Sequence, residues 1–174
     1  MSLFDEIGSL VAQYAAGQTP ATGAVNEHFD QMAQAAPPSS MAAGLAAALG
    51  SGGSGEFAQM ASQLFSNSDG AQQAGMLNSL LATAGPEVLQ QFLGANAGSG
   101  LASLLSGGQT QVTPDQAASI APEEVQALAQ HVHNNDPSVI NRVSEIYAEH
   151  PTLIKSLGTA AMGIAMREIA QRHA

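Results

Sequence analysis

The sequence predicts an all-α protein, a single-domain bundle of about seven to nine short helices. Apolar residues recur at helical spacing almost throughout, and no stretch of five or more residues alternates strictly with β-branched enrichment. Aromatic residues make up 4% of the chain and apolar residues 45%, so Ala, Leu, Ile, Val and Met must form the core. The length of 174 residues is that of one ordinary domain.

The first two helices are expected over residues 3–16 and about 21–35. Each carries an apolar residue once per turn, which is the pattern of a helix with one buried face. The two stripes are Leu3, Ile7, Leu10 and Tyr14, and then Val25, Phe29, Met32 and Ala36. A proline ends the second helix, because Pro37 is followed by another proline and neither can continue the hydrogen-bond ladder.

Small side chains dominate the third expected helix, "MAAGLAAALG", which Ser39 or Ser40 is expected to cap. Such side chains let another helix backbone approach closely. The "GSGGSG" stretch at 50–55 then predicts an ordered loop. A fourth helix follows, with an inward face formed by Phe57, Met60, Ala61, Leu64 and Phe65.

Asp69 and Gln72 have the spacing of a capping box and predict the start of a fifth helix. Gly85 is its expected last residue, and Pro86 then suits the first turn of a further short helix. The two inward faces are Met76, Leu77, Leu80, Leu81 and Ala84, and then Val88, Leu89, Phe92 and Leu93.

The stretch 94–108 is rich in Gly, Ser and Asn, which predicts a second ordered loop in which "LASLL" forms one or two helical turns. Thr113, Pro114 and Gln116 then begin a brief helix.

Three more helices are expected after residue 120. The first spans 122–134, and its predicted inward face consists of Val125, Leu128, Ala129 and Val132. In the next, Asp136 is the expected cap, Pro137 the first residue, and the stripe includes Val143 and Tyr147, whose hydroxyl should reach the rim. The last helix, 151–170, is apolar almost all round through its middle, so we expect it to be buried inside the bundle or inside an oligomer interface, and it is the best candidate for a central helix.

Charge and composition disfavour several classes of function. All four basic residues lie in the last 33 positions, so residues 1–141 contain eleven acids and no base. Such a segment cannot neutralise phosphates, and we expect no nucleic-acid partner and no docking to anionic lipid. The absence of cysteine removes thiol chemistry and fits a reducing compartment.

Membrane and export signals are also missing. The longest weakly polar run, "SLGTAAMGIAM" at 156–166, is well short of the roughly 20 residues that span a bilayer. The N-terminal "MSLFDEIGSLVAQY" has acids where a signal peptide has bases. We therefore expect no membrane span and a cytoplasmic location.

One stretch, "HVHNNDPSVINRVSEIYAEHP" at 131–151, could suggest a metal or catalytic site because it contains three of the five histidines. On a helix, His131 and His133 point about 200° apart and cannot share one ion. If 122–134 and 137–149 form an antiparallel hairpin, His133 lies at the turn and His150 lies roughly 20 Å away at the other end. We predict no metal site here and interpret these residues as a helical joint.

A polar cluster, "NEHFDQ" at 26–31, places His28 beside Phe29 and Asp30. It is either a recognition patch or a core phenylalanine with solvated neighbours. His28, Asp30, His133 and His150 are thus the polar candidates, but none forms a catalytic, cofactor or metal motif. The "GSGGSG" match to G-x-G-x-x-G follows a helix rather than a strand. Spacing alone neither supports nor excludes a Ser/His/Asp triad.

The segments "LFDEI" and "VTPDQAASIAPEEVQALAQ" at 112–130, together with the Gly-rich middle, resemble the YidB-like family of small bacterial helical proteins. The segments "HFDQMAQ", "AGMLNSLL" and "EHPTLIKSLGTAAM" are similar to bacterial proteins of unassigned function. The C-terminal "TLIKSLGTAAMGIAMREIA" departs from the Leu-Pro and Thr-Pro ending of the YidB-like family. The resemblance implies an all-helical bacterial domain and supplies no catalytic residue.

These observations predict a non-enzymatic structural or interaction module, without a cofactor, that self-associates through Ala/Gly-rich helix faces. The alternative is a carrier or sensor that holds an apolar small molecule between helices. Four methionines, Met60, Met76, Met162 and Met166, would then line an adaptable cavity.

Overall fold

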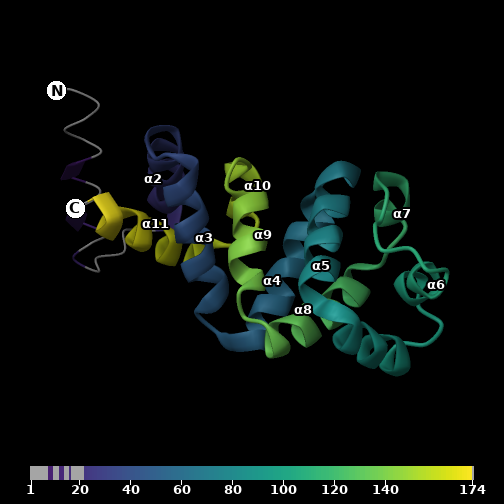
Figure 1. Ribbon diagram of the computed structural model, residues 1–174. Coiled ribbons are helices and arrows are strands. Elements are labelled where there is room, and N and C mark those ends of the chain that lie inside the picture. The colour runs from purple at the N-terminus through teal and green to yellow at the C-terminus, as the bar shows by residue number, and fades with distance from the viewer. Residues whose placement is uncertain (1–7, 10–11, 14–15, 17–21, 174) are drawn as a thin grey trace.

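A computed structural model gives the fold and describes residues 8, 9, 12, 13, 16 and 22–173 (Figure 1). All regular elements in this part of the chain are helices, which confirms the all-α prediction. They number ten: α2 (Thr22–Ala35), α3 (Pro38–Gly50), α4 (Gly53–Asn67), α5 (Gly70–Ala95), α6 (Gly100–Ser106), α7 (Pro114–Ala118), α8 (Pro122–Asn135), α9 (Val139–Tyr147), α10 (Pro151–Lys155) and α11 (Thr159–His173). The helix expected over 3–16 falls largely outside the described residues.

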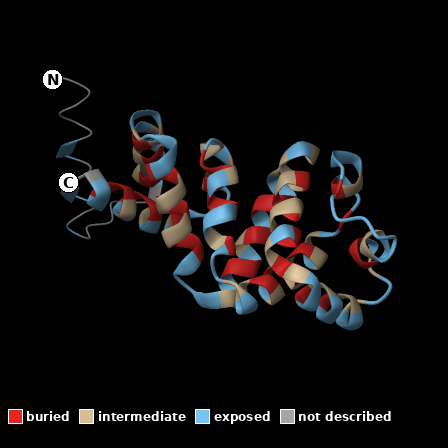
Figure 2. Ribbon diagram, viewed as in Figure 1, coloured by how far each residue is buried: buried red, intermediate tan, exposed pale blue. Residues whose placement is uncertain are grey.

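The helices form an elongated array (Figure 1). α2, α3 and α11 gather at one end, α9 and α10 lie beside them, α4, α5 and α8 follow, and α6 and α7 lie at the other end. α3 packs chiefly against α11 and α9, α4 against α8, and α5 against α7, α8 and α9. One continuous apolar core links these pairs, and Figure 2 shows its buried residues on the facing sides of the helices.

The start of α3 differs from the prediction of a serine cap. Pro37 is the N-cap residue, with φ −66° and ψ 155°, and no side chain accepts a hydrogen bond there. Pro38 needs no partner in the first turn because it has no N–H group. Ser40 lies inside the helix and is buried.

The "GSGGSG" stretch is a shorter break than expected. α4 begins at Gly53, whose φ of +79° lets the chain reverse within Ser51 and Gly52. Its inward residues Phe57, Ala61, Leu64 and Phe65 are fully buried, and Met60 is half-buried. The second stretch expected to be a loop, 94–108, contains α6, which confirms helical turns in "LASLL".

The Asp69 capping box is confirmed. Its carboxylate accepts the Gln72 N–H at 2.9 Å, and its own N–H donates to the Gln72 side chain at 3.0 Å. The same box forms between Thr113 and Gln116 at α7. Each box satisfies two backbone N–H groups that a helix start leaves without partners.

Gly85 interrupts α5 with φ 67° and ψ 168°, a conformation open essentially to glycine alone. Pro86 then begins the second half of the helix. This confirms the predicted break, and the inward stripe before it is buried at Met76, Leu77, Leu80, Leu81 and Ala84. After it, Val88 and Phe92 are buried, while Leu89 and Leu93 are half-buried.

The α8–α9 junction departs from the prediction. Asp136 is the C-cap residue of α8 rather than the N-cap residue of the next helix, and α9 begins at Val139. Asp136 Oδ1 accepts the Ser138 N–H at 3.0 Å. Hydrogen bonds from the Ser138 side chain and backbone lower the pKa of this carboxyl group. α8 and α9 then diverge instead of forming an antiparallel hairpin, since α8 packs on α4 and α9 on α3.

The single C-terminal helix expected over 151–170 is two helices, α10 and α11. The chain turns between them at Ser156–Gly158, where Gly158 has a φ of +93°. α11 lies at the end of the array rather than at its centre. It buries one face, formed by Ala161, Met162, Ala165, Met166, Ile169 and Ala170, whereas Ile164 on the other side is 36% exposed.

Candidate interaction surface

The two histidines of "HVH" lie against different aromatic rings. His131 Nδ1 donates to the Ala127 carbonyl at 2.9 Å, and its ring meets the Phe92 ring edge-on at 6.2 Å. The His133 ring stacks on Phe57 at 5.1 Å, with its Nδ1 atom buried and without a hydrogen-bond partner. Both rings therefore serve packing of α8 against its neighbours, and they do not share a ligand position.

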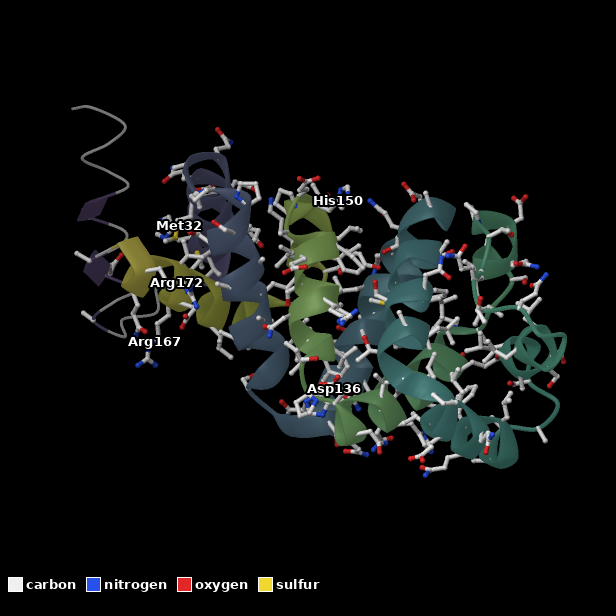
Figure 3. The ribbon with its side chains drawn as sticks, in the orientation of Figure 1. Met32, Asp136, His150, Arg167 and Arg172 are labelled. Carbon is white, nitrogen blue, oxygen red and sulfur yellow. The ribbon has the colours of Figure 1, made fainter. Side chains whose placement is uncertain are left out.

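Figure 3 shows that Asp136 and His150 lie at opposite ends of the α9 and α10 region. His150 is the N-cap residue of α10 and is half-buried. Its backbone N–H donates to the Tyr147 carbonyl at 2.9 Å. His150 is thus at the opposite end of this region from the α8–α9 junction, near which His133 lies.

The Lys155 Nζ atom lies 2.5 Å from the Asp30 carboxylate oxygens. This ion pair joins α10 to α2 across 125 positions of sequence. The two side chains are 47% and 28% exposed, so solvent screens the pair and it contributes at most about 1 kcal/mol. His28 is half-buried on the same helix. Among residues 22–173 and the few described before them, no three His, Asp or Glu side chains could hold a metal ion together.

Tyr147 lies deeper than predicted, since it is fully buried and its hydroxyl does not reach the rim. That hydroxyl is 2.9 Å from Ser68 Oγ, and Ser68 Oγ donates to the Leu64 carbonyl at 2.6 Å. Because Ser68 has given its hydrogen to Leu64, Tyr147 is the donor between the two hydroxyls. Burial raises the pKa of Tyr147 to about 12.

An open groove of about 470 Å³ runs along the outer side of α3. Its floor consists of small side chains on successive turns of α3: Ala42, Ala43, Ala46 and Ala47. Asn141 and Glu145 of α9 form one rim, and Glu168 and Arg172 of α11 form the other. We call this surface the alanine groove.

Gly44 explains how α11 comes close enough to form the second rim. A Cβ atom at Gly44 would lie 2.7 Å from the Ala165 carbonyl oxygen and 2.8 Å from Ile169 Cγ1. Only a residue without a side chain lets the two backbones approach this closely. In the "MAAGLAAALG" segment, Gly44 therefore admits α11, whereas Ala42, Ala43, Ala46 and Ala47 stay half-buried between α9 and α11.

The rim on α11 carries an ion pair, with Arg172 Nε 3.0 Å from Glu168 Oε1. Figure 3 shows Arg167 and Arg172 on this helix. The exposed Ile164 lies one turn before Glu168, and residues four apart share a helix face. The rim itself thus carries charges of both signs, and Ile164 lies one turn away on α11 without lining the groove.

The methionines considered for a ligand cavity pack in or against the apolar core. Met76, Met162 and Met166 are fully buried within the apolar cluster, and Met60 is half-buried against it. None of them lines the alanine groove. The sequence indicated the small residues of α3, but it gave no sign that α9 and α11 would flank them.

Comparison of the chain with protein-family models, with curated proteins and with solved structures finds no match. The resemblance to the YidB-like family stays a prediction. Within the described ranges, no helix combines the length and the apolar character needed to cross a bilayer.

Proposed function

We propose that this chain is a non-enzymatic interaction module that self-associates through the alanine groove, so that the partner is a second copy of the chain. The observation that supports it best is the groove itself: four alanines of α3 left half-buried between the rims of α9 and α11. A floor of Cβ atoms presents little side-chain entropy to lose and lets a helix approach closely.

The charge distribution is compatible with contact between copies at this surface. The whole chain has a net charge of −10, so two copies repel each other on average. From residue 142 onward, however, four bases stand against three acids. Both rims of the groove come from α9 and α11, which contain most of this segment, so repulsion between copies is weaker here than the net charge of the whole chain suggests.

The test compares one substitution at two alanines. Ala46→Gln fills the groove with an uncharged side chain of good helix propensity. Ala95→Gln, at the exposed end of α5 and outside the groove, is the matched control. Light scattering after size exclusion, over a range of protein concentrations, gives the dissociation constant of the oligomer.

We expect the unmodified chain and Ala95→Gln to associate alike, and Ala46→Gln to associate about tenfold more weakly, a difference of about 1.4 kcal/mol. Thermal unfolding of all three proteins checks that the fold is kept. A chain that stays monomeric at high micromolar concentration would contradict the proposal. Equal association by the two variants would place the contact elsewhere.

A further inference from the structure

A second hollow, of about 390 Å³, lies where α5 meets α6 and the loop after it. Ala82 and the loop residues 108–111 line part of it. The rest of the lining consists of four leucines: Leu81, Leu89, Leu93 and Leu105. Three of the four are half-buried, although most large apolar side chains of this protein are fully covered. Hollows of this size and apolar lining are typical of small-molecule sites.

The break in α5 shapes the hollow. Leu81 precedes Gly85, and Leu89 and Leu93 follow it, so the lining comes from both halves of the kinked helix. The φ of +67° at Gly85 changes the direction of the chain between them. A straight helix would not present these side chains to Leu105 in the same arrangement.

The opposite wall, residues 105–111, is anchored on both sides. Before it, the Glu124 carboxylate of α8 accepts the N–H groups of Gly100 and Leu101 at 3.2 and 2.8 Å, which fixes the start of α6. After it, the Asn78 side chain accepts the Val112 N–H at 2.7 Å and donates to the Val112 carbonyl at 3.1 Å. The wall therefore does not need a ligand to hold its position.

The lining also limits the charge of a ligand. It contains no ionisable side chain, and its polar members are the exposed Gln109, Thr110 and Gln111. No Lys or Arg occurs anywhere in residues 1–141. A carboxylate or phosphate would therefore lose hydration here without gaining a counter-charge. Amide and hydroxyl groups, in contrast, suit a ligand hydroxyl or carbonyl.

We propose that this leucine hollow binds an uncharged amphipathic small molecule. Its alkyl or aromatic part lies among the four leucines, and its hydroxyl or carbonyl group faces residues 109–111. The site is separate from the alanine groove, so it stands independently of self-association.

Direct binding is tested with the neutral fluorescent probe N-phenylnaphthylamine. Its emission should rise with the full-length chain and fall when decanol displaces it. Decanoate, which has the same chain length but a charge, should compete at least about tenfold more weakly, since its carboxylate finds no cation. Absence of probe binding, or equal competition by decanoate, would overturn the proposal.

Two tryptophan variants locate the site. Leu89→Trp fills the hollow and should weaken probe binding at least about tenfold, whereas Gln90→Trp, exposed on the same helix, should not. The melting temperature checks folding, and a folded Leu89→Trp that binds the probe normally refutes the location. If Leu89→Trp instead lowers self-association and leaves probe binding unchanged, a side chain of a second copy occupies the hollow, and the small-molecule proposal is wrong.

Discussion

The Tyr147 hydroxyl lies 2.9 Å from Ser68 Oγ and links α9 to the C-cap residue of α4, 79 positions earlier in the sequence. The Tyr147 ring is fully buried, and its hydroxyl donates to a serine that in turn donates to the Leu64 carbonyl. This short chain of hydrogen bonds satisfies the polar end of the largest fully buried side chain. It also makes the stability of the protein depend on the protonation of one phenol.

The first prediction concerns alkaline pH. The pKa of Tyr147 is raised from 10.0 to about 12, so the folded state holds this proton more tightly than the unfolded state. The stabilisation is complete below about pH 10 and is lost as the pH rises towards about 12. Two pKa units at about 1.4 kcal/mol each amount to on the order of 3 kcal/mol lost above about pH 12, of which about half is lost by about pH 11.

Urea unfolding at about pH 8 and about pH 11 measures this loss. Tyr147→Phe should be about 1 kcal/mol less stable near neutral pH, because one hydrogen bond is removed. It should then show a much smaller decrease at the higher pH. An equal decrease in both proteins would mean that another group is responsible.

The second prediction tests the approach of α11 to α3. Gly44→Ala places a Cβ atom 2.7 Å from the Ala165 carbonyl oxygen, which belongs to a backbone that cannot rotate away. We expect a loss of about 1–3 kcal/mol in the free energy of unfolding, despite the better helix propensity of alanine. Gly163→Ala in α11, where a Cβ atom would meet nothing within 4 Å, should instead stabilise the protein by up to about 1 kcal/mol. If both variants were destabilised, the loss at Gly44 could not be assigned to the clash with the Ala165 carbonyl oxygen.

The third prediction concerns the carboxylate that caps α6. Glu124→Gln removes the charge and one acceptor oxygen from the N–H groups of Gly100 and Leu101. We expect a loss of about 1 kcal/mol and faster amide hydrogen exchange confined to 100–106. Glu123→Gln, an exposed change in the same first turn of α8, controls for the helix dipole. Equal amide exchange rates over 100–106 in the two variants would show that Glu124 does not hold the start of α6.

The fourth prediction concerns the kink. Gly85→Ala puts a Cβ atom on a residue with φ 67° and ψ 168°, so strain of about 1–3 kcal/mol is expected even though a Cβ atom would meet nothing within 4 Å. Binding of N-phenylnaphthylamine should weaken as well. Gly94→Ala, in the second half of α5, where a Cβ atom would also meet nothing within 4 Å, should leave probe binding unchanged and stabilise the protein by up to about 1 kcal/mol. If Gly85→Ala unfolded with the same free energy as the unmodified chain, the backbone at the kink would have relaxed without strain.

The residues that act locally could be recognised in the sequence. The stripe from Met76 to Ala84, the capping boxes that begin at Asp69 and Thr113, and the break at Gly85 depend on neighbours within a few positions. Apolar spacing and hydrogen-bonding side chains are therefore enough to predict them. The prediction over 151–170 was wrong in two respects. The segment breaks at Gly158, which lies in an apolar stretch that resembles one long helix, and α11 lies at the end of the array rather than at its centre.

Residue pattern alone is enough to predict the all-helical class, most of the inward faces and the concentration of bases at the C-terminal end. Three contacts could be found only in the folded chain: α9 and α11 flank the alanines of α3, Tyr147 meets Ser68, and Glu124 holds the start of α6. The difference arises from distance along the chain. Each of these contacts joins residues far apart in sequence, and many helix pairings would bury the same apolar stripes equally well. The choice among them depends on local fit, such as the missing side chain at Gly44 that admits the backbone of Ala165.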